Sequence, residues 1–355
     1  MPKRIRVRAI VIGVAMLAGL SIAGLTACGG SAANTSGTPA GSVAASAPTT
    51  PNVEPPIAQA PVQSGTAPAK SASPQGFSGD RAYDQVAKLV GFGPHPPATD
   101  AIHRVQEYIL SQLNGYGCKV ETDDFHAATP VGSVLMKNIV VKVPGNGSNT
   151  ILLATHYDTD TLDPNDKKLT NFVGADDGGS STGLMLEMAR VLCGKPQPAN
   201  IWIAFLDGEE AFVHWDNDTD SVFGSKELAA RLALSGDLPH VKAFVLADLV
   251  GGKKIHLKRE SNSTPWLADI VWSTAARLGH QDIFVPEKSG GIEDDHLPFM
   301  NRKVPVVDII DLDITKDVPY WHTPQDTLDK ISPHSLQVVG DVILASLPEI
   351  AKHSR

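Results

Sequence analysis

Histidine and carboxylate side chains recur along the chain near the ends of apolar segments. In chain order they are His156, Asp158, Asp176, Asp177, Asp207, Glu209, Glu210, Asp248, the run from Glu293 to His296, and His322. Imidazole and carboxylate groups together suit Zn²⁺, which in catalytic sites keeps one position open for the substrate. Any single group of this kind is more typical of a helix cap or an acidic turn. Their repetition along one chain is not explained by caps and turns, because unpaired buried carboxylates cost free energy. The pattern therefore predicts a metal centre.

The apolar segments have the composition of buried strands. They span residues 138–143, 151–156, 201–207, 243–249 and 304–310. Helical spacing of apolar residues predicts helices over 102–113, 184–192, 225–234, 265–278 and 334–350. Ser180 and Ser181 stand where they could cap the second of these helices. The alternation predicts a single α/β domain whose mainly parallel central sheet is flanked by helices. In such sheets, functional sites form at the carboxyl ends of the strands.

The charge balance excludes some classes of partner. The 355 residues include 30 Lys and Arg against 39 Asp and Glu, which gives a formal net charge of −9. Because the chain is acidic and has no dense basic cluster, we do not expect it to bind nucleic acid. With 42% hydrophobic residues it can bury a core, so a wholly disordered chain is excluded as well. No segment has the pattern of a subunit interface, and we expect a monomer.

The N-terminal residues 1–27 have the pattern of an export signal. Basic residues at positions 3–8 precede an apolar run over 9–24, and Leu-Thr-Ala-Cys follows at 25–28. That last motif resembles the bacterial lipobox, which implies cleavage after residue 27 and lipidation of Cys28. The alternatives are an ordinary cleaved signal with a chance cysteine, or an uncleaved anchor. We expect an exported cell-envelope lipoprotein on the periplasmic or outer-surface side of a bacterial membrane, which it contacts only through the lipid.

Residues 28–75 are rich in Ala, Ser, Thr and Pro and predict a disordered tether. The catalytic domain is expected over 76–355. It contains Cys118 and Cys193, which an oxidising compartment allows to pair. Their spacing in the sequence is equally compatible with two free thiols.

Short motifs in this domain resemble those of a known superfamily. His-Tyr-Asp at 156–158, Gly-Ala-Asp-Asp at 174–177, Asp-Gly-Glu-Glu at 207–210, Ala-Asp-Leu at 247–249 and Trp-His-Thr at 321–323 are similar to motifs of the zinc aminopeptidases with a co-catalytic metal centre. The longer stretches 205–215, 220–225 and 291–299 resemble its glutaminyl-peptide cyclotransferase branch, the glutaminyl cyclases. The resemblance covers about residues 80–350 and implies a fold of the zinc aminopeptidase type.

The resemblance implies a set of metal ligands. Asp177, Glu210 and His322 match the ligands of a single zinc ion, and one Zn²⁺ per chain is expected. His156 stands where the aminopeptidases bind a second zinc. In the cyclases its counterpart is usually present without that second metal.

The same resemblance also implies catalytic and substrate-binding residues. Glu209 matches the carboxylate that shuttles a proton during the reaction. Asp248 and Asp294 match the acidic pair that hydrogen-bonds near the attacking amine. Trp215 and Trp321 match the aromatic walls of a small substrate pocket.

These roles imply an acyltransferase that acts on peptides and proteins with N-terminal glutamine. It would convert that glutamine to pyroglutamate and release ammonia. Two alternatives stay open at this point. One is a two-zinc aminopeptidase that hydrolyses N-terminal residues with water, and the other is a non-catalytic binding module on a retired peptidase fold.

Overall fold

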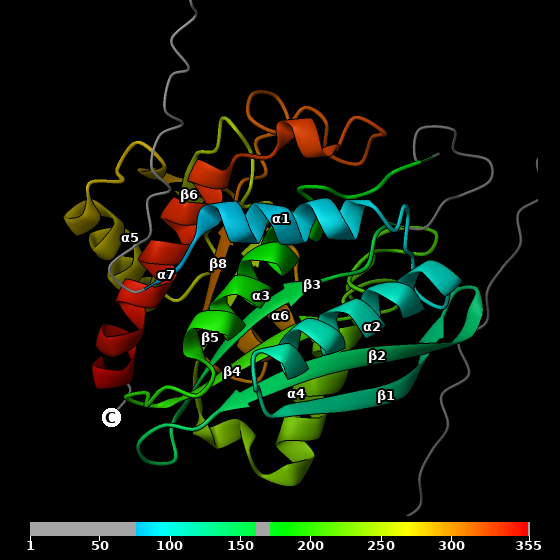
Figure 1. The fold of residues 1–355 in the computed structure, drawn as a ribbon. Coiled ribbons are helices and arrows are strands. Elements are labelled where there is room, and N and C mark those ends of the chain that lie inside the picture. Colours follow the sequence, from blue (N-terminus) through cyan, green and yellow to red (C-terminus); the bar gives the residue numbers. More distant parts are fainter. Residues whose placement is uncertain (1–75, 161–170, 354–355) are drawn as a thin grey trace, which may run out of the picture. The chain divides into compact units, whose positions relative to one another are not determined.

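The computed structural model describes residues 76–160 and 171–353 (Figure 1). The expected export signal, the lipidation residue Cys28 and the tether lie outside the described residues. Within these residues, no helix is both long and apolar enough to cross a membrane.

A six-stranded sheet forms the centre of the fold, in the order β1-β2-β4-β3-β5-β8. Its strands are β1 (Val120–Thr129), β2 (Gly132–Val143), β3 (Thr150–His156), β4 (Asn200–Leu206), β5 (Val241–Asp248) and β8 (Val306–Ile310). The last four run parallel to one another, whereas β1 and β2 pair antiparallel. A separate parallel pair consists of β6 (Leu257–Arg259) and β7 (Phe284–Lys288). The predicted α/β class with a mainly parallel sheet is confirmed.

Helices cover both faces of the sheet. One face packs against α1 (Gly79–Val90), α2 (Asp100–Gly115), α3 (Gly179–Leu192), α5 (Pro265–Leu278) and α7 (Pro333–His353). The other packs against α4 (Phe223–Ser235) and the short α6 (Leu297–Met300). Figure 1 shows α1 lying across α3 beside α7. Successive strand residues point to opposite faces, as Ile203 and Ala204 of β4 do, so both must be apolar.

All five predicted strands and all five predicted helices are present; α5 has the predicted ends, and the other elements are shifted at one end or both. Prediction missed α1, α6, β1, β6 and β7, and it misjudged the start of α3. Ser180 and Ser181 do not cap that helix, because its N-cap is Gly178, which makes no side-chain cap. The Ser180 hydroxyl instead donates at 2.7 Å to the carbonyl oxygen of Asp176, which precedes the helix.

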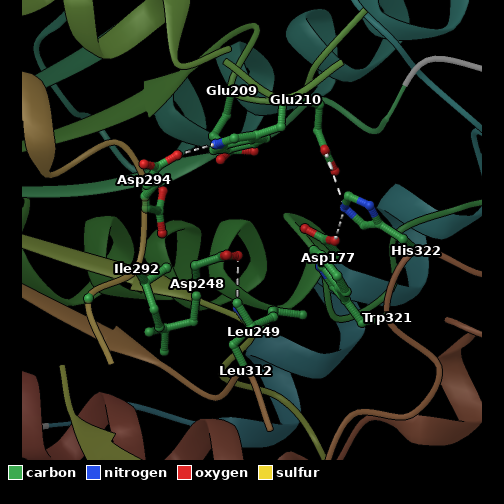
Figure 2. A pocket seen from close by; sticks show the side chains of 14 residues that line it. Asp177, Glu209, Glu210, Asp248, Leu249, Ile292, Asp294, Leu312, Trp321 and His322 are labelled. Carbon is green, nitrogen blue, oxygen red and sulfur yellow. Dashed lines mark hydrogen bonds and ion pairs between the residues drawn. The ribbon is translucent and has the colours of Figure 1, made fainter. Parts of the chain in front are cut away.

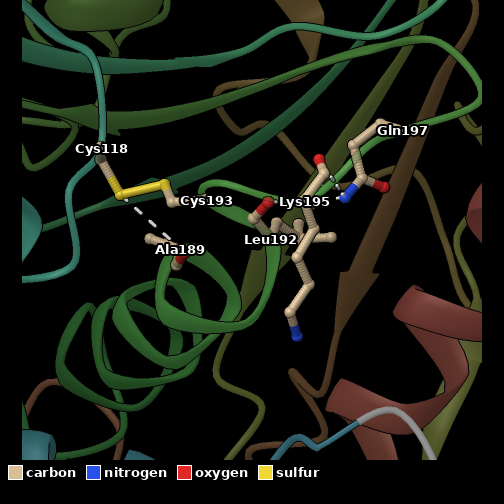
Figure 3. The surroundings of a disulfide bond; sticks show 6 residues. All are labelled: Cys118, Ala189, Leu192, Cys193, Lys195 and Gln197. Carbon is tan, nitrogen blue, oxygen red and sulfur yellow. Dashed lines mark hydrogen bonds between the residues drawn. A yellow bond between two sulfur atoms is a disulfide. The ribbon is translucent and has the colours of Figure 1, made fainter.

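The two cysteines of the domain form a disulfide bond (Figure 3). Cys118 lies between α2 and β1, and Cys193 directly follows α3. Their Cα atoms are 5.2 Å apart although 75 positions separate them in the sequence. The alternative that the sequence left open is thereby settled in favour of pairing.

Candidate active site

A cavity of about 380 Å³ opens at the carboxyl ends of the parallel strands (Figure 2). Its lining consists of Asp177, Glu209, Glu210, Trp215, Asp248, Leu249, Gly291, Ile292, Glu293, Asp294, Ile310, Leu312, Trp321 and His322. Every candidate metal, catalytic and pocket residue of the sequence is among them except His156, which lies beside Asp177 and Asp248. The site gathers here because β3, β4, β5 and β8 all end at this edge.

Asp177, Glu210 and His322 converge from three separate loops. The Nε2 atom of His322 lies 3.3 Å from Asp177 Oδ2 and 3.4 Å from Glu210 Oε2. On its other side, Asp177 Oδ1 is 3.3 Å from His156 Nε2, which is 3.1 Å from Asp248 Oδ1. Asp177 therefore stands between two clusters, each able to hold a cation.

The electrostatics of these groups fit a metal ion. Asp177 Oδ2 and Glu210 Oε1 are buried and accept no hydrogen bond within the described residues. Burial raises the pKa of Glu210 to about 8. Burial alone would lower the pKa of His322, yet the carboxylates of Glu210 and Asp177 raise it to about 11. A cluster that draws protons this strongly has an excess of negative charge, which a bound cation would balance.

Two further carboxylates hold the backbone of the metal-binding loops. The oxygens of Asp158 accept from the amides of Glu209 at 3.1 Å and Glu210 at 3.2 Å. Those of Asp326 accept from the amides of Asp176 at 2.8 Å and Asp177 at 3.0 Å. Each loop backbone is thus held by one carboxylate, and the side chains of the loop can then face the cavity.

The Asp158 contacts give a testable prediction. Changing Asp158 to alanine removes the acceptor for both amides, and we expect the affinity for the metal to fall about 10- to 100-fold, as is typical for loss of an outer-shell partner. A competition titration against a chromophoric chelator measures this affinity. The matched control is the exposed Asp237, changed to alanine before β5 and away from the site. An Asp158→Ala protein with unchanged affinity would show that the loop needs no such support.

Sequence reasoning missed several residues of this site. Asp326 had no signal, since it is one acid in a polar loop after the Trp-His-Thr motif. Asp160 was also missed, and it lies near Glu210 and His322 in a group able to hold a metal ion. Ile292 lies in the stretch 291–299 but was given no role there, and Leu312 lies outside every motif; both add apolar surface to the pocket.

Glu209, Asp248 and Asp294 form an acidic group away from the His322 side of the pocket. Burial raises the pKa of Glu209 well above its ordinary value, and the charges of Glu210 and Asp294 add to this. Burial likewise raises the pKa of Asp294, together with the charge of Asp248. Figure 2 shows Asp248 and Asp294 across the pocket from His322. A carboxyl group with a raised pKa can both accept and return a proton near neutral pH.

Two tryptophans border the pocket from separate loops. The ring of Trp321 stacks on that of His322, with centroids 4.0 Å apart and planes at 25°. The Trp215 indole donates to Glu293 Oε2 at 3.2 Å. The loop before Trp215 is held by Asp220, whose carboxylate accepts from three successive backbone amides, 212–214, at 2.7–2.9 Å. Two indole rings therefore form part of the cavity wall.

Comparisons with known proteins agree with this geometry. Residues 138–347 match the sequence profile of Peptidase family M28. A Mus musculus glutaminyl-peptide cyclotransferase-like protein is 30% identical over 284 residues, which cover 72% of this chain and 71% of the mouse protein. The crystal structure of an Acidobacteriales bacterium glutaminyl cyclase shares 39% identity and a TM-score of 0.73, covering 84% of this chain and all of that one.

A second similar structure has a different description. It is a Zn-dependent exopeptidase from Parabacteroides distasonis, with 31% identity and a TM-score of 0.67 over 76% of this chain and 97% of that one. The family profile covers more than half of this chain, and the mouse relative aligns over more than two thirds of its own length. The chain belongs to peptidase family M28, where its relatives include glutaminyl-peptide cyclotransferases.

Proposed function

We propose that this protein converts the N-terminal glutamine of peptides and proteins to pyroglutamate and releases ammonia. The observation that carries the proposal is one small cavity that combines a metal-type ligand set, the buried Glu209, and the two tryptophans. The names of the mouse relative and of the Acidobacteriales structure support the same reaction.

The metal in this proposal is zinc, one ion per chain. Asp177, Glu210 and His322 would hold it, and their two carboxylates and one imidazole are ligands that zinc accepts in catalytic sites. Bound there, zinc supplies a Lewis acid for the γ-amide carbonyl of the substrate. The description of the Parabacteroides distasonis structure supports the choice of zinc.

The chain's own groups move the protons. The α-amine nitrogen of the substrate forms a bond to the γ-carbonyl carbon, and the bond from that carbon to the amide nitrogen breaks. Glu209 takes a proton from the amine and returns it to the leaving nitrogen, which departs as ammonia. Asp248 and Asp294 accept hydrogen bonds from the amine and orient it toward the carbonyl.

The pocket walls favour ring closure over hydrolysis. The glutamine side chain must fold back on its own amine, and rings on either side restrict it to that conformation. Such positioning can lower the activation barrier of ring closure substantially, because the entropy cost of orienting the reacting groups is met on binding. In this proposal the substrate, once seated between Trp215 and Trp321, displaces the water that would otherwise hydrolyse it.

One observation favours a second candidate, the two-zinc aminopeptidase. His156, Asp177 and Asp248 lie close enough to hold another metal ion. In that case water would attack the peptide bond and the first residue would be released. A count of tightly bound zinc separates the two, since two ions per chain would favour the aminopeptidase. A non-catalytic binding module is disfavoured by the intact ligand set and by Glu209.

Ammonia release tests the proposal together with its metal. The purified protein is incubated with a glutamine-headed peptide, and ammonia is followed with a coupled enzyme. We expect release that stops after treatment with a chelator and returns when one equivalent of Zn²⁺ is added. Ammonia release that persists in the fully metal-free protein would contradict the role given to zinc.

We also propose that the mature protein is a monomeric lipoprotein, anchored through Cys28 to a bacterial membrane and exposed on its periplasmic or outer-surface side. The support is the sequence pattern of residues 1–28. Fractionation of cells that express the wild type or Cys28→Ala tests the anchor, since only the wild type should sediment with membranes. Sedimentation velocity on the detergent-solubilised protein tests the monomer.

A further inference from the structure

A second groove of about 300 Å³ adjoins the active-site cavity. Its lining consists of His256, Lys258, Lys288, Ser289, Gly290, Ile292, Ile310, Asp311, Leu312, Asp313, Ile314 and Thr315. Ile292, Ile310 and Leu312 line both the groove and the active-site cavity, so the two spaces meet along one apolar wall. Figure 2 shows Ile292 and Leu312 at one end of the active-site cavity.

Of the two lysines that line the groove, one has no ion-pair partner among the described residues. Lys258 lies 2.8 Å from Asp313 Oδ2, so each neutralises the other. Asp311 accepts from the His256 amide at 2.8 Å, and burial raises its pKa to about 7. Lys288, at the end of β7, is exposed, and no carboxylate of the described residues lies within ion-pair distance of it.

A peptide substrate needs a surface next to the cavity for the residues that follow its first one. Only its first residue enters the cavity, and the rest of the peptide must leave through an opening. The rest of the cavity lining includes the metal ligands and the two tryptophans, Trp215 and Trp321. An extended chain advances about 3.3 Å per residue, so the residues directly after the first would reach a space that shares the cavity wall. The exposed Ile314, 49% accessible, extends the apolar surface of that space.

We propose that this groove binds the residues that follow the N-terminal glutamine, and that Lys288 selects peptides with an acidic side chain there. The inference rests on the proposed function, because it takes the active-site cavity as the place of the glutamine. The active-site cavity is strongly acidic and repels a substrate carboxylate. In the groove, Lys258 is paired with Asp313, so Lys288 is the ammonium group available to attract one.

The test is a glutamate scan of a short peptide. The reference is Gln-Ala-Ala-Ala-Ala, and glutamate replaces alanine at positions two, three or four in turn. At low ionic strength we expect one of these to show a kcat/KM about two- to fivefold above the reference, the size of an exposed ion pair. The gain should lie in KM, because Lys288 does not touch the reacting atoms. It should shrink in 0.5 M salt.

Variants of Lys288 test whether this residue causes the preference for glutamate. Lys288→Ala should abolish the preference for glutamate, and Lys288→Glu should invert it in favour of a lysine-containing peptide. The matched control is Lys303→Glu, which changes the net charge equally but precedes β8 at its amino end. A glutamate preference that Lys288→Glu leaves intact, or that Lys303→Glu removes as well, would overturn the proposal, as would equal turnover of all peptides.

A binding measurement keeps this proposal separable from the proposed reaction. Fluorescence anisotropy of the same peptides, labelled at the carboxyl end, reports binding whether or not a ring forms. If the reference peptide is not cyclised, the proposed function is wrong, and the anisotropy of the Lys288 variants still decides the groove. Tighter binding of the glutamate peptide by the wild type than by Lys288→Glu supports it, and equal binding contradicts it.

Discussion

Glu209→Gln is expected to lower kcat about 10²- to 10⁴-fold, the usual contribution of a general acid–base group, without loss of bound zinc. The amide of glutamine has nearly the same shape as the carboxylate but cannot take a proton from the amine. The backbone amide of residue 209 still donates to Asp158, so the loop should stay in place. Steady-state kinetics and metal analysis on the same preparation measure both quantities.

The neighbouring glutamate provides the matched control. Glu210→Gln alters one of the three expected ligands, so we expect that protein to lose zinc along with activity. Both variants change one carboxylate to an amide in adjacent positions held by the same Asp158. If Glu209→Gln loses the metal and Glu210→Gln keeps it, the two roles are the reverse of those assigned here.

Removal of the disulfide should cost the folded state about 4 kcal/mol, because the unfolded chain then regains the freedom of a loop closed over 75 positions. The variant is Cys118→Ser with Cys193→Ser, and urea denaturation measures the free energy of unfolding. Activity in the absence of urea should change little. Cys193 lies at the far end of α3 from Asp177, and a helix of 14 residues is about 20 Å long.

A reduced wild-type protein is the control for the serine substitutions themselves. It should unfold at the same urea concentration as the double variant, and well below the oxidised wild type. If oxidised and reduced proteins unfold together, the disulfide contributes nothing to the stability of the domain. A double variant less stable than the reduced wild type would instead point to a packing defect from the serines.

The buried strands could be predicted from the sequence because both of their faces are covered. A strand such as β3 is apolar at every position but its first and last two, and few other structures need that pattern. Edge strand β1 escaped prediction for the opposite reason. Its sequence from Val120 to Thr129 contains three acidic residues, and only alternate positions are buried. β1 pairs with β2 in a hairpin whose two-residue turn, 130–131, is Pro-Val and not one of the Gly-containing pairs that signal such turns.

The site was predictable where motifs are short and lie at strand ends. Glu209 and Glu210 follow β4, and Asp177 directly precedes α3. His322 lies in the loop after β8, and parallel strands bring their ends to one edge. The hydrogen bonds from backbone amides to Asp158 and Asp326 were not predictable. Asp326 lies about 150 positions from the loop that it holds. Nothing in the types of these residues predicts that contact, since only the folded chain brings them together.

The most direct test of the central claim is mass spectrometry of two peptides after incubation with the zinc-loaded full-length protein. One peptide begins with glutamine and the other with leucine. We expect the glutamine peptide to lose the mass of one ammonia and the leucine peptide to stay unchanged. Loss of the whole first residue from either peptide would contradict the account and indicate an aminopeptidase. No change in either peptide would show that the intact ligand set does not support catalysis.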